Sequence, residues 1–261
     1  MLAQKLAIGP QDIAVVMGDT DLVAKGMGTF GSRTMLAAGT AIKAGVDRIV
    51  ETARPHAADM LEVGAADLEF ADGRFSVVGT DRAMSLAEVA ASVPAGLAAE
   101  AFEPAGDATF PNGCHICEVA IDPETGTVSV ERYLAVDDVG TVINPLLMKG
   151  QIHGGVAQGL SQALFERIVY DAQSGQLLTA SFMDYAMPRA DDLPSMMVES
   201  HPVPTPTNPL GAKGAGEAGT VGSLAAVISA VSDALSPLGI RHIDMPATPE
   251  RIWRVIKSVG R

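Results

Sequence analysis

Segments with the alternating apolar pattern of β-strands occur in pairs joined by short turns, and helical segments separate the pairs. Residues 68–78 predict a hairpin around Asp72-Gly73, because this dipeptide adopts the positive φ angles of tight hairpin turns. Residues 114–121 and 128–138 predict a second pair across "DPETG", and residues 166–182 a third. Paired strands with helices between them favour an α+β fold with hairpin-built mixed sheets over a doubly wound sheet.

The helical segments divide the chain further. We expect a long small-residue helix over 35–60 that Pro55 kinks or divides, a glycine-rich helix over 150–168, and an apolar helix over 223–235. Residues 95–111 are rich in Ala, Pro, Gly and acidic residues and predict a linker. The sequence therefore predicts two α+β subdomains, 1–105 and 106–261.

Shorter elements complete the predicted order. Residues 2–7 resemble the last turns of a helix closed by Gly9 and Pro10, and residues 12–19 and 240–244 are strand-like. Ser85 and Glu88 have the spacing of a capping box at a helix start. A final helix is expected to open near Thr248-Pro249.

Charge and cysteine content exclude several classes of protein. The net charge of −13 argues against nucleic acid and anionic membranes as partners. We find no apolar run of about 18 residues, the length that a membrane span needs, and expect a cytoplasmic protein. Cys114 and Cys117 form a CxxC, but on a strand they would point to opposite faces, so we expect two free thiols and no metal site.

A loop at residues 211–219, "GAKGAGEAG", holds four glycines and one acidic residue, Glu217. Bare backbone around a carboxylate leaves room for a reacting group to approach it. Gly214, Gly216 and Gly219 also satisfy G-x-G-x-x-G, with Asp244 about 25 residues beyond, which is a dinucleotide-binding pattern. That pattern must directly follow a buried strand, whereas proline-rich "PVPTPTNPLGAK" precedes this one.

Two further segments carry polar residues among glycines. The loop "GMGTFGSRT" at 26–34 runs into a helix start, which makes it either an anion cradle or an ordinary helix cap. In the helix at 150–168, four glycines predict close packing against a backbone or a ligand, and His153 and Gln158 are polar on a segment expected to be buried. Asp137 and Asp138 suggest turn or cap residues.

Taken together, five segments resemble the molybdopterin-binding large subunit of the xanthine dehydrogenase and aldehyde oxidase family, nearest its carbon monoxide dehydrogenase large-chain branch. They are "GTFGSRT", "AVDDVGTVINPLLMKGQIHGGVAQGLSQALFE", "SFMDYAMPRADDLP", "PTNPLGAKGAGEAGT" and "SPLGIRHIDMPATPERIW". The resemblance covers almost the whole chain, but only the C-terminal portion of such a subunit. The N-terminal half, with the loop that distinguishes the branches, is not in this sequence.

The resemblance implies the cofactor and the site. The expected cofactor is molybdenum held by molybdopterin cytosine dinucleotide, with oxidative hydroxylation of an aldehyde, an N-heterocycle or carbon monoxide. Glu217 matches the family's general base. The residues that match the family's cofactor-binding segments are Gly31, Ser32, Arg33, Thr34, Asp138, Asn144, Gln158, Lys213, Gly214 and Gly216. Among these, Lys213 is the natural partner for a phosphate.

The resemblance also implies partners. We expect the N-terminal half of the large subunit, an FAD-binding medium subunit and a [2Fe-2S] small subunit, in a homo-oligomer without nucleic acid or membrane. This chain alone is expected to be inactive. Two alternatives stay open: an NAD-binding dehydrogenase domain, and a non-catalytic assembly module or truncated relic of the large subunit. A buried strand directly before Gly211 would favour the NAD-binding domain.

Overall fold

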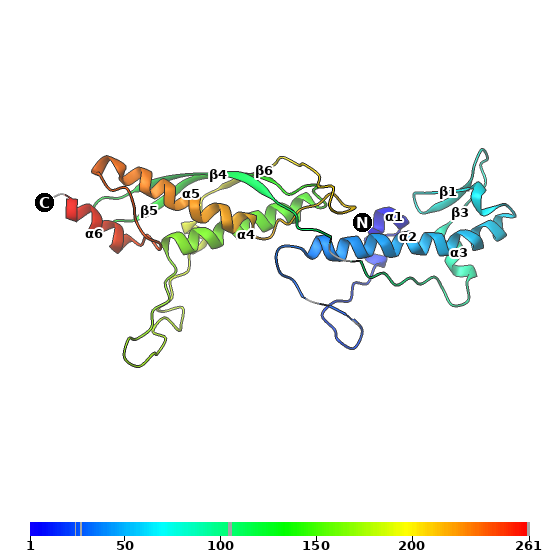
Figure 1. The fold of residues 1–261 in the computed structure, drawn as a ribbon, viewed down its shortest axis with the longest axis horizontal. Coiled ribbons are helices and arrows are strands. Elements are labelled where there is room, and N and C mark those ends of the chain that lie inside the picture. The colour runs from blue at the N-terminus through cyan, green and yellow to red at the C-terminus, as the bar shows by residue number, and fades with distance from the viewer. Residues whose placement is uncertain (24, 27, 104–105, 260–261) are drawn as a thin grey trace. The chain divides into compact units, whose positions relative to one another are not determined.

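The computed structural model describes residues 1–23, 25, 26, 28–103 and 106–259. Met27 of the predicted anion-cradle loop and residues 104–105 of the predicted linker lie outside these ranges. The chain divides into two compact units. Unit 1 contains Met1–Asp107 together with Asn208–Leu210, and unit 2 contains Ala108–Thr207 and Gly211–Arg261. Within the described residues we find six α-helices and two three-stranded sheets, so the predicted α+β class is confirmed (Figure 1).

Unit 1 is a long helix packed against a small antiparallel sheet. Its elements are α1 (Leu2–Leu6), α2 (Thr34–Leu61), β1 (Leu68–Ala71), β2 (Arg74–Val77), β3 (Ala83–Ser85) and α3 (Leu86–Ser92), with 3-10 turns at Pro10–Asp12 and Ala65–Asp67. The strand order is β1-β2-β3. The core lies between α2, the sheet and α3, and is centred on Ala53, Ala57, Phe75 and Val89.

Local signals predicted most of unit 1. Asp72 and Gly73 join β1 to β2 with φ angles of 49° and 71°. The capping box is confirmed, because Ser85 and Glu88 each accept a hydrogen bond from the other's backbone N–H. The expected division at Pro55 is wrong. Pro55 lies inside a continuous α2, whose buried small residues on both sides of it pack on the sheet and hold the helix together.

The strand predicted at residues 12–19 is also wrong. Pro10–Asp12 form a 3-10 turn and the following residues pair with no strand of the described chain. Val15, Val16 and Met17 are exposed. An alternating apolar pattern is consistent with a strand, but a strand also needs a neighbour to accept its backbone hydrogen bonds.

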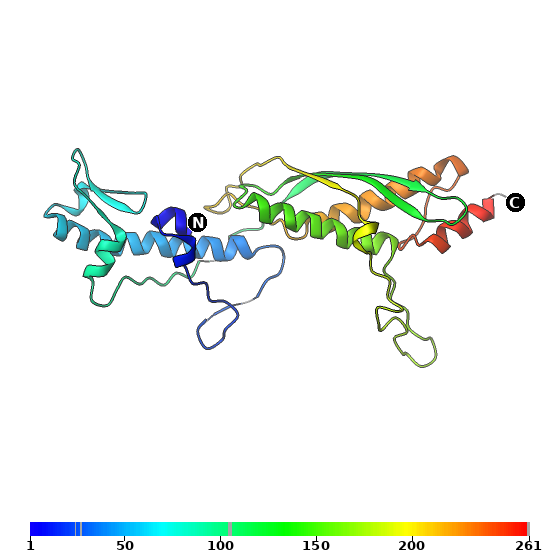
Figure 2. The same ribbon diagram turned by 180° about the vertical axis from the view of Figure 1, so that it is seen from behind.

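Unit 2 is a mixed sheet covered on one face by two long helices. Its elements are β4 (Asn112–Ile121), β5 (Val128–Asp138), α4 (Pro145–Leu164), β6 (Met196–Ser200), α5 (Ala218–Leu235) and α6 (Pro249–Val259), with 3-10 turns at Ala190–Asp192 and Ser236–Leu238. Figure 2 shows α4 and α5 side by side along the sheet. Ile152, Val156, Leu160, Val227 and Val231 fill the core between helices and sheet.

The β4–β5 hairpin, the two long helices and the final helix of unit 2 are as predicted, although α4 and α5 each begin about five residues earlier than expected. Three other segments differ from the prediction. β6 was not predicted, and it pairs in parallel with β5, each residue with a partner 63 positions away in the sequence. The hairpin expected at 166–182 is reduced to one isolated bridge, Tyr170 with Leu177. The strand expected at 240–244 is wrong: Ile240 and Ile243 are buried in the core, and the segment pairs with no described strand.

Among the described residues, Ala218–Leu238 is one segment whose length and composition would allow it to cross a membrane, and 22% of its apolar window is buried. Its helix, α5, packs against α4 and β4.

Candidate active site

The glycines of α4 bring its backbone against the start of α5. A Cβ atom on Gly155 would lie 2.8 Å from the Thr220 backbone N and 2.9 Å from Gly219 Cα. A Cβ on Gly159 would lie 2.8 Å from the Thr220 carbonyl oxygen and would overlap the Ser223 hydroxyl. These contacts are shorter than side chains tolerate, so the close packing predicted for the glycine-rich helix is packing against another helix backbone.

Thr220 joins the two helices at this crossing. Its hydroxyl lies 3.1 Å from the Gly155 carbonyl oxygen and 3.1 Å from Gln158 Oε1, and can donate to either. Glu217 lies three residues earlier, at the N-cap position of α5, and its side chain is exposed. The fold thus brings Gln158 to the helix turn that Glu217 begins, although the two residues are 59 positions apart. Gln158 and His153 are exposed, not buried as expected.

A buried ion pair anchors the glycine-rich loop. Lys213 Nζ lies 2.5 Å from Asp138 Oδ2, and the two side chains are 11% and 8% exposed. The other carboxylate oxygen of Asp138 accepts hydrogen bonds from the backbone N–H groups of Gly140 (2.8 Å) and Val203 (3.0 Å). Burial alone would raise the pKa of Asp138, but these donors outweigh it and hold that pKa below its usual value.

Backbone pairing reinforces the anchor. Ala212 forms an isolated antiparallel bridge with Gly140, and the Lys213 N–H donates to the Val139 carbonyl oxygen at 2.8 Å. Gly211 has a φ of 64°, a conformation that favours glycine. The first three residues of the loop are therefore attached to the end of β5. Asp138 is the buried last residue of that strand, and it accepts the N–H of Gly140 two residues later, as an aspartate in a turn does, so the expected turn role fits.

Three other predicted residues of unit 2 lie near these anchors. Asn144 is the N-cap of α4, where its side-chain oxygen accepts a hydrogen bond from the Leu147 N–H at 3.1 Å. Gly214 is buried and Gly216 is half-buried in the stretch between Lys213 and Glu217. The side chain of Asn144 has thus a clear structural task at the start of α4.

The four remaining predicted residues belong to unit 1, three in the loop before α2 and one, Thr34, at the start of that helix. Gly31 and Ser32 both have positive φ angles, 58° and 53°, and Arg33 is the N-cap of α2. The Arg33 guanidinium stacks 3.7 Å from the centre of the Phe30 ring. The Thr34 hydroxyl lies 2.9 Å from that of Thr29. The loop places backbone N–H groups and one cation at a helix N-terminus, as an anion cradle requires.

Sequence reasoning missed a buried polar network beneath α5. His115 on β4 lies 2.8 Å from the Tyr133 hydroxyl through Nδ1 and 3.2 Å from Asp137 through Nε2. A Cβ on Gly222 of α5 would overlap the imidazole ring, so this glycine makes room for it. Burial raises the pKa of Tyr133. Side chains alternate between the two faces of β4, and His115 lies on the inward face with Cys117 and Val119. This alternation could have indicated that His115 is buried.

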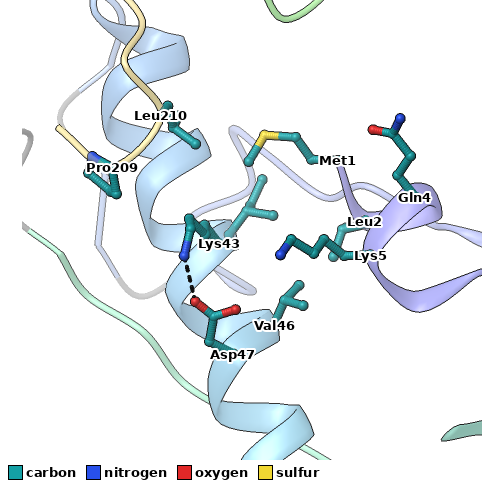
Figure 3. A pocket seen from close by; sticks show the side chains of 10 residues that line it. Met1, Leu2, Gln4, Lys5, Lys43, Val46, Asp47, Pro209 and Leu210 are labelled. Carbon is teal, nitrogen blue, oxygen red and sulfur yellow. Dashed lines mark hydrogen bonds and ion pairs between the residues drawn. The ribbon is translucent and has the colours of Figure 1, made fainter. Parts of the chain in front are cut away.

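Unit 1 also contains an apolar pocket, which is separate from the predicted residues. It has a volume of about 230 Å³ and lies between α1, α2 and the Pro209-Leu210 segment (Figure 3). The Lys43–Asp47 ion pair of 2.7 Å lies on its rim. None of the predicted site residues lines it.

Comparisons with known proteins agree with the motifs. Residues 1–194 match the family described as "Molybdopterin cofactor-binding domain". The chain belongs to this molybdopterin-binding family. It is 39% identical to the carbon monoxide dehydrogenase large chain of Hydrogenophaga pseudoflava, over 99% of this chain and 33% of that protein. It is 38% identical to subunit gamma of the 6-hydroxypseudooxynicotine dehydrogenase complex of Paenarthrobacter nicotinovorans, over 100% of this chain and 34% of that subunit.

The fold agrees as well. Carbon monoxide dehydrogenase from Oligotropha carboxidovorans superposes with a TM-score of 0.91 at 38% identity, over 99% of this chain and 33% of that one. The predicted resemblance to the molybdopterin-binding large subunit, nearest the carbon monoxide dehydrogenase large chain, is confirmed, and the chain spans about a third of the length of these relatives. The NAD-binding alternative lacks its required element, because residues 201–210, directly before Gly211, contain no strand.

Proposed function

We propose that this chain contributes the catalytic glutamate and part of the molybdopterin site of a molybdenum hydroxylase large subunit, as its C-terminal portion. The observation that carries the proposal is the crossing of α4 and α5. There Thr220 links Gln158 to the turn that begins at Glu217, within a loop fixed to β5 by the Asp138–Lys213 pair. An exposed carboxylate on a rigid frame can meet a group supplied by the remaining two-thirds of such a subunit.

The residues present fit a polyanionic cofactor that brings its own metal ligands. Across the described ranges, no cluster of three His, Cys, Asp or Glu side chains could hold a metal ion by itself. The Gly31–Thr34 loop, with its positive φ angles and Arg33 at the start of α2, offers donors for phosphate or pterin oxygens. Gln158 offers an amide, and Gly214 and Gly216 leave the backbone bare beside Glu217. The cytosine dinucleotide form of the cofactor is part of this proposal.

The residues divide into two roles. Glu217 is the general base: its carboxylate accepts a proton from the attacking oxygen during oxidation of the substrate. Asp138, Lys213 and Asn144 position this machinery, because their polar groups are engaged with one another or with the backbone. When bound, the molybdenum cofactor supplies the two-electron redox chemistry. The substrate class is an aldehyde, an N-heterocycle or carbon monoxide.

The proposed assembly is cytoplasmic and includes the rest of the large subunit, an FAD-binding subunit and a [2Fe-2S] subunit. It is tested by co-expressing this chain with a polypeptide that supplies the rest of the large subunit and with both electron-transfer subunits. We expect one molybdenum per complex and dye reduction with a substrate of the proposed class. Equal molybdenum and turnover when this chain is omitted would contradict the proposal. Assembly without turnover would favour the non-catalytic module.

A further inference from the structure

A 24-residue arm projects from unit 2 between α4 and β6, at residues 166–189 (yellow-green in Figures 1 and 2). No residue of the arm is buried. It nevertheless carries six large apolar side chains that are at least half exposed: Ile168, Tyr170, Leu178, Phe182, Met183 and Met187. Phe182 and Met183 reach 83% and 92% exposure. Such a concentration of exposed apolar side chains on one segment marks an interaction site.

Hydrogen bonds hold the arm in a defined shape. At its base, Glu166 accepts hydrogen bonds from the hydroxyls of Ser161, in α4, and Tyr185, the latter at 2.6 Å. In its outer part, Asp171 accepts from the N–H and hydroxyl groups of Ser174 at 2.8 and 2.7 Å. The arm is therefore ordered without a core of its own, so little conformational entropy would be lost when a partner covers it.

Side-chain chemistry narrows the kind of surface that the arm fits. Phe182 and Met183 are adjacent, and the turn that presents them is closed by the Ser181 hydroxyl, which lies 3.0 Å from Asp184. An aromatic ring beside a flexible thioether fits an apolar groove of protein side chains. The arm carries three acidic and two basic residues. Because these charges nearly cancel, the arm does not complement a partner surface of strong single charge.

The length of the relatives indicates what covers the arm. This chain superposes over 99% of its length on a dehydrogenase chain of which it spans 33%. In such a chain about two-thirds of the polypeptide is available to pack on the arm. We propose that Phe182 and Met183 dock into an apolar groove of the polypeptide that supplies the rest of the large subunit. This inference rests on the proposed assembly and deepens it by naming the surface through which this chain joins.

The test uses the double variant F182S/M183S. Because both side chains are exposed, the variant chain should fold as the wild type does, which circular dichroism and urea unfolding check. The binding probe is the segment of the Hydrogenophaga pseudoflava carbon monoxide dehydrogenase large chain outside the matched third. We expect F182S/M183S to weaken binding of this probe at least tenfold. The matched control is Phe110→Ser, which removes an aromatic ring that lies outside the arm and is 77% exposed. We expect this control to change the affinity for the probe by less than twofold.

A second readout is independent of affinity. Peroxide should oxidise Met183 at least tenfold more slowly in the complex than in the free chain, because docking covers its sulfur. Wild-type binding that F182S/M183S leaves unchanged, or no binding by the wild type, would overturn the inference. So would a wild-type homodimer that the double variant converts to monomers, since a second copy would then occupy the arm. A failure of the proposed catalytic role would be seen in a different result: the Glu217→Gln variant would retain turnover in complexes that assemble normally.

Discussion

Lys213 Nζ lies 2.5 Å from Asp138 Oδ2, and this buried pair joins the start of the glycine-rich loop to the end of β5. The two residues are 75 positions apart in the sequence. From the family resemblance we expected both to face the cofactor, with Lys213 on a phosphate. In the folded chain the ammonium and the carboxylate face each other, and we infer that they act by setting where the loop, and with it Glu217, is held.

Removing one member of this pair should destabilise the chain. For Lys213→Met we expect the free energy of unfolding to fall by about 3 kcal/mol, because a buried carboxylate loses its counter-ion. Urea unfolding of the 261-residue chain at pH 7 measures this. The control is Glu250→Gln, which breaks the exposed Arg254–Glu250 pair of α6 and should cost less than about 0.5 kcal/mol. Equal losses in the two variants would contradict the role given to the buried pair.

The same pair predicts a pH dependence of stability. The pKa of Asp138 is lower in the folded chain than in the unfolded one, so its ionised form favours folding. This contribution is complete above the unfolded pKa of about 3.9 and is lost as the pH falls through the lower folded value. The difference in unfolding free energy between wild type and Asp138→Asn should therefore shrink below about pH 4. A difference that is constant from pH 7 to pH 2.5 would contradict this.

The helix crossing beneath Glu217 makes opposite predictions for two glycines of α4. Gly159→Ala should lower the free energy of unfolding by about 1–3 kcal/mol, because its Cβ would overlap the Ser223 hydroxyl of α5. Gly154 has no atom within 4 Å of an added Cβ. Gly154→Ala should thus raise stability by about 0.5–1 kcal/mol through helix propensity alone. Thermal and urea unfolding compare the two variants, and a stability that Gly159→Ala leaves unchanged or raises would show that α4 and α5 are not in close contact.

The two cysteines should differ in reactivity. Burial raises the pKa of the Cys117 thiol to about 11, whereas Cys114 is exposed on the outer face of β4. At pH 8 about one Cys117 in a thousand is then a thiolate, the reactive form. We expect iodoacetamide to label Cys114 at least 100-fold faster in the native chain, as followed by peptide mass spectrometry. In urea the two rates should converge; rates that are similar in the native chain would contradict the burial of Cys117.

The elements that could be predicted from the sequence are those that residues close together in the chain determine. Asp72-Gly73 specifies its own hairpin, and Ser85 with Glu88 specifies a helix start, because each signal lies within four residues. β6 could not be predicted in this manner. Its parallel partner β5 lies far away in the sequence, and five residues with one buried side chain, Val198, leave no periodic signal.

The candidate site shows the same limit. Motifs singled out Gln158 and Glu217 separately, but their convergence depends on Thr220 and on helix packing that only the fold shows. The pairing of Asp138 with Lys213 is equally non-local. The His115 network was missed because its members, on two strands, carry no motif as a set.

The central claim is that Glu217 acts as a base in the assembled enzyme, and Glu217→Gln tests it most directly. The variant keeps the size of the side chain and removes its capacity to accept a proton at the ionised carboxylate. We predict that kcat/KM falls by about 1,000-fold, within the range of a lost general base, while molybdenum content and complex assembly stay at wild-type levels. Wild-type turnover by the Glu217→Gln complex would contradict the account.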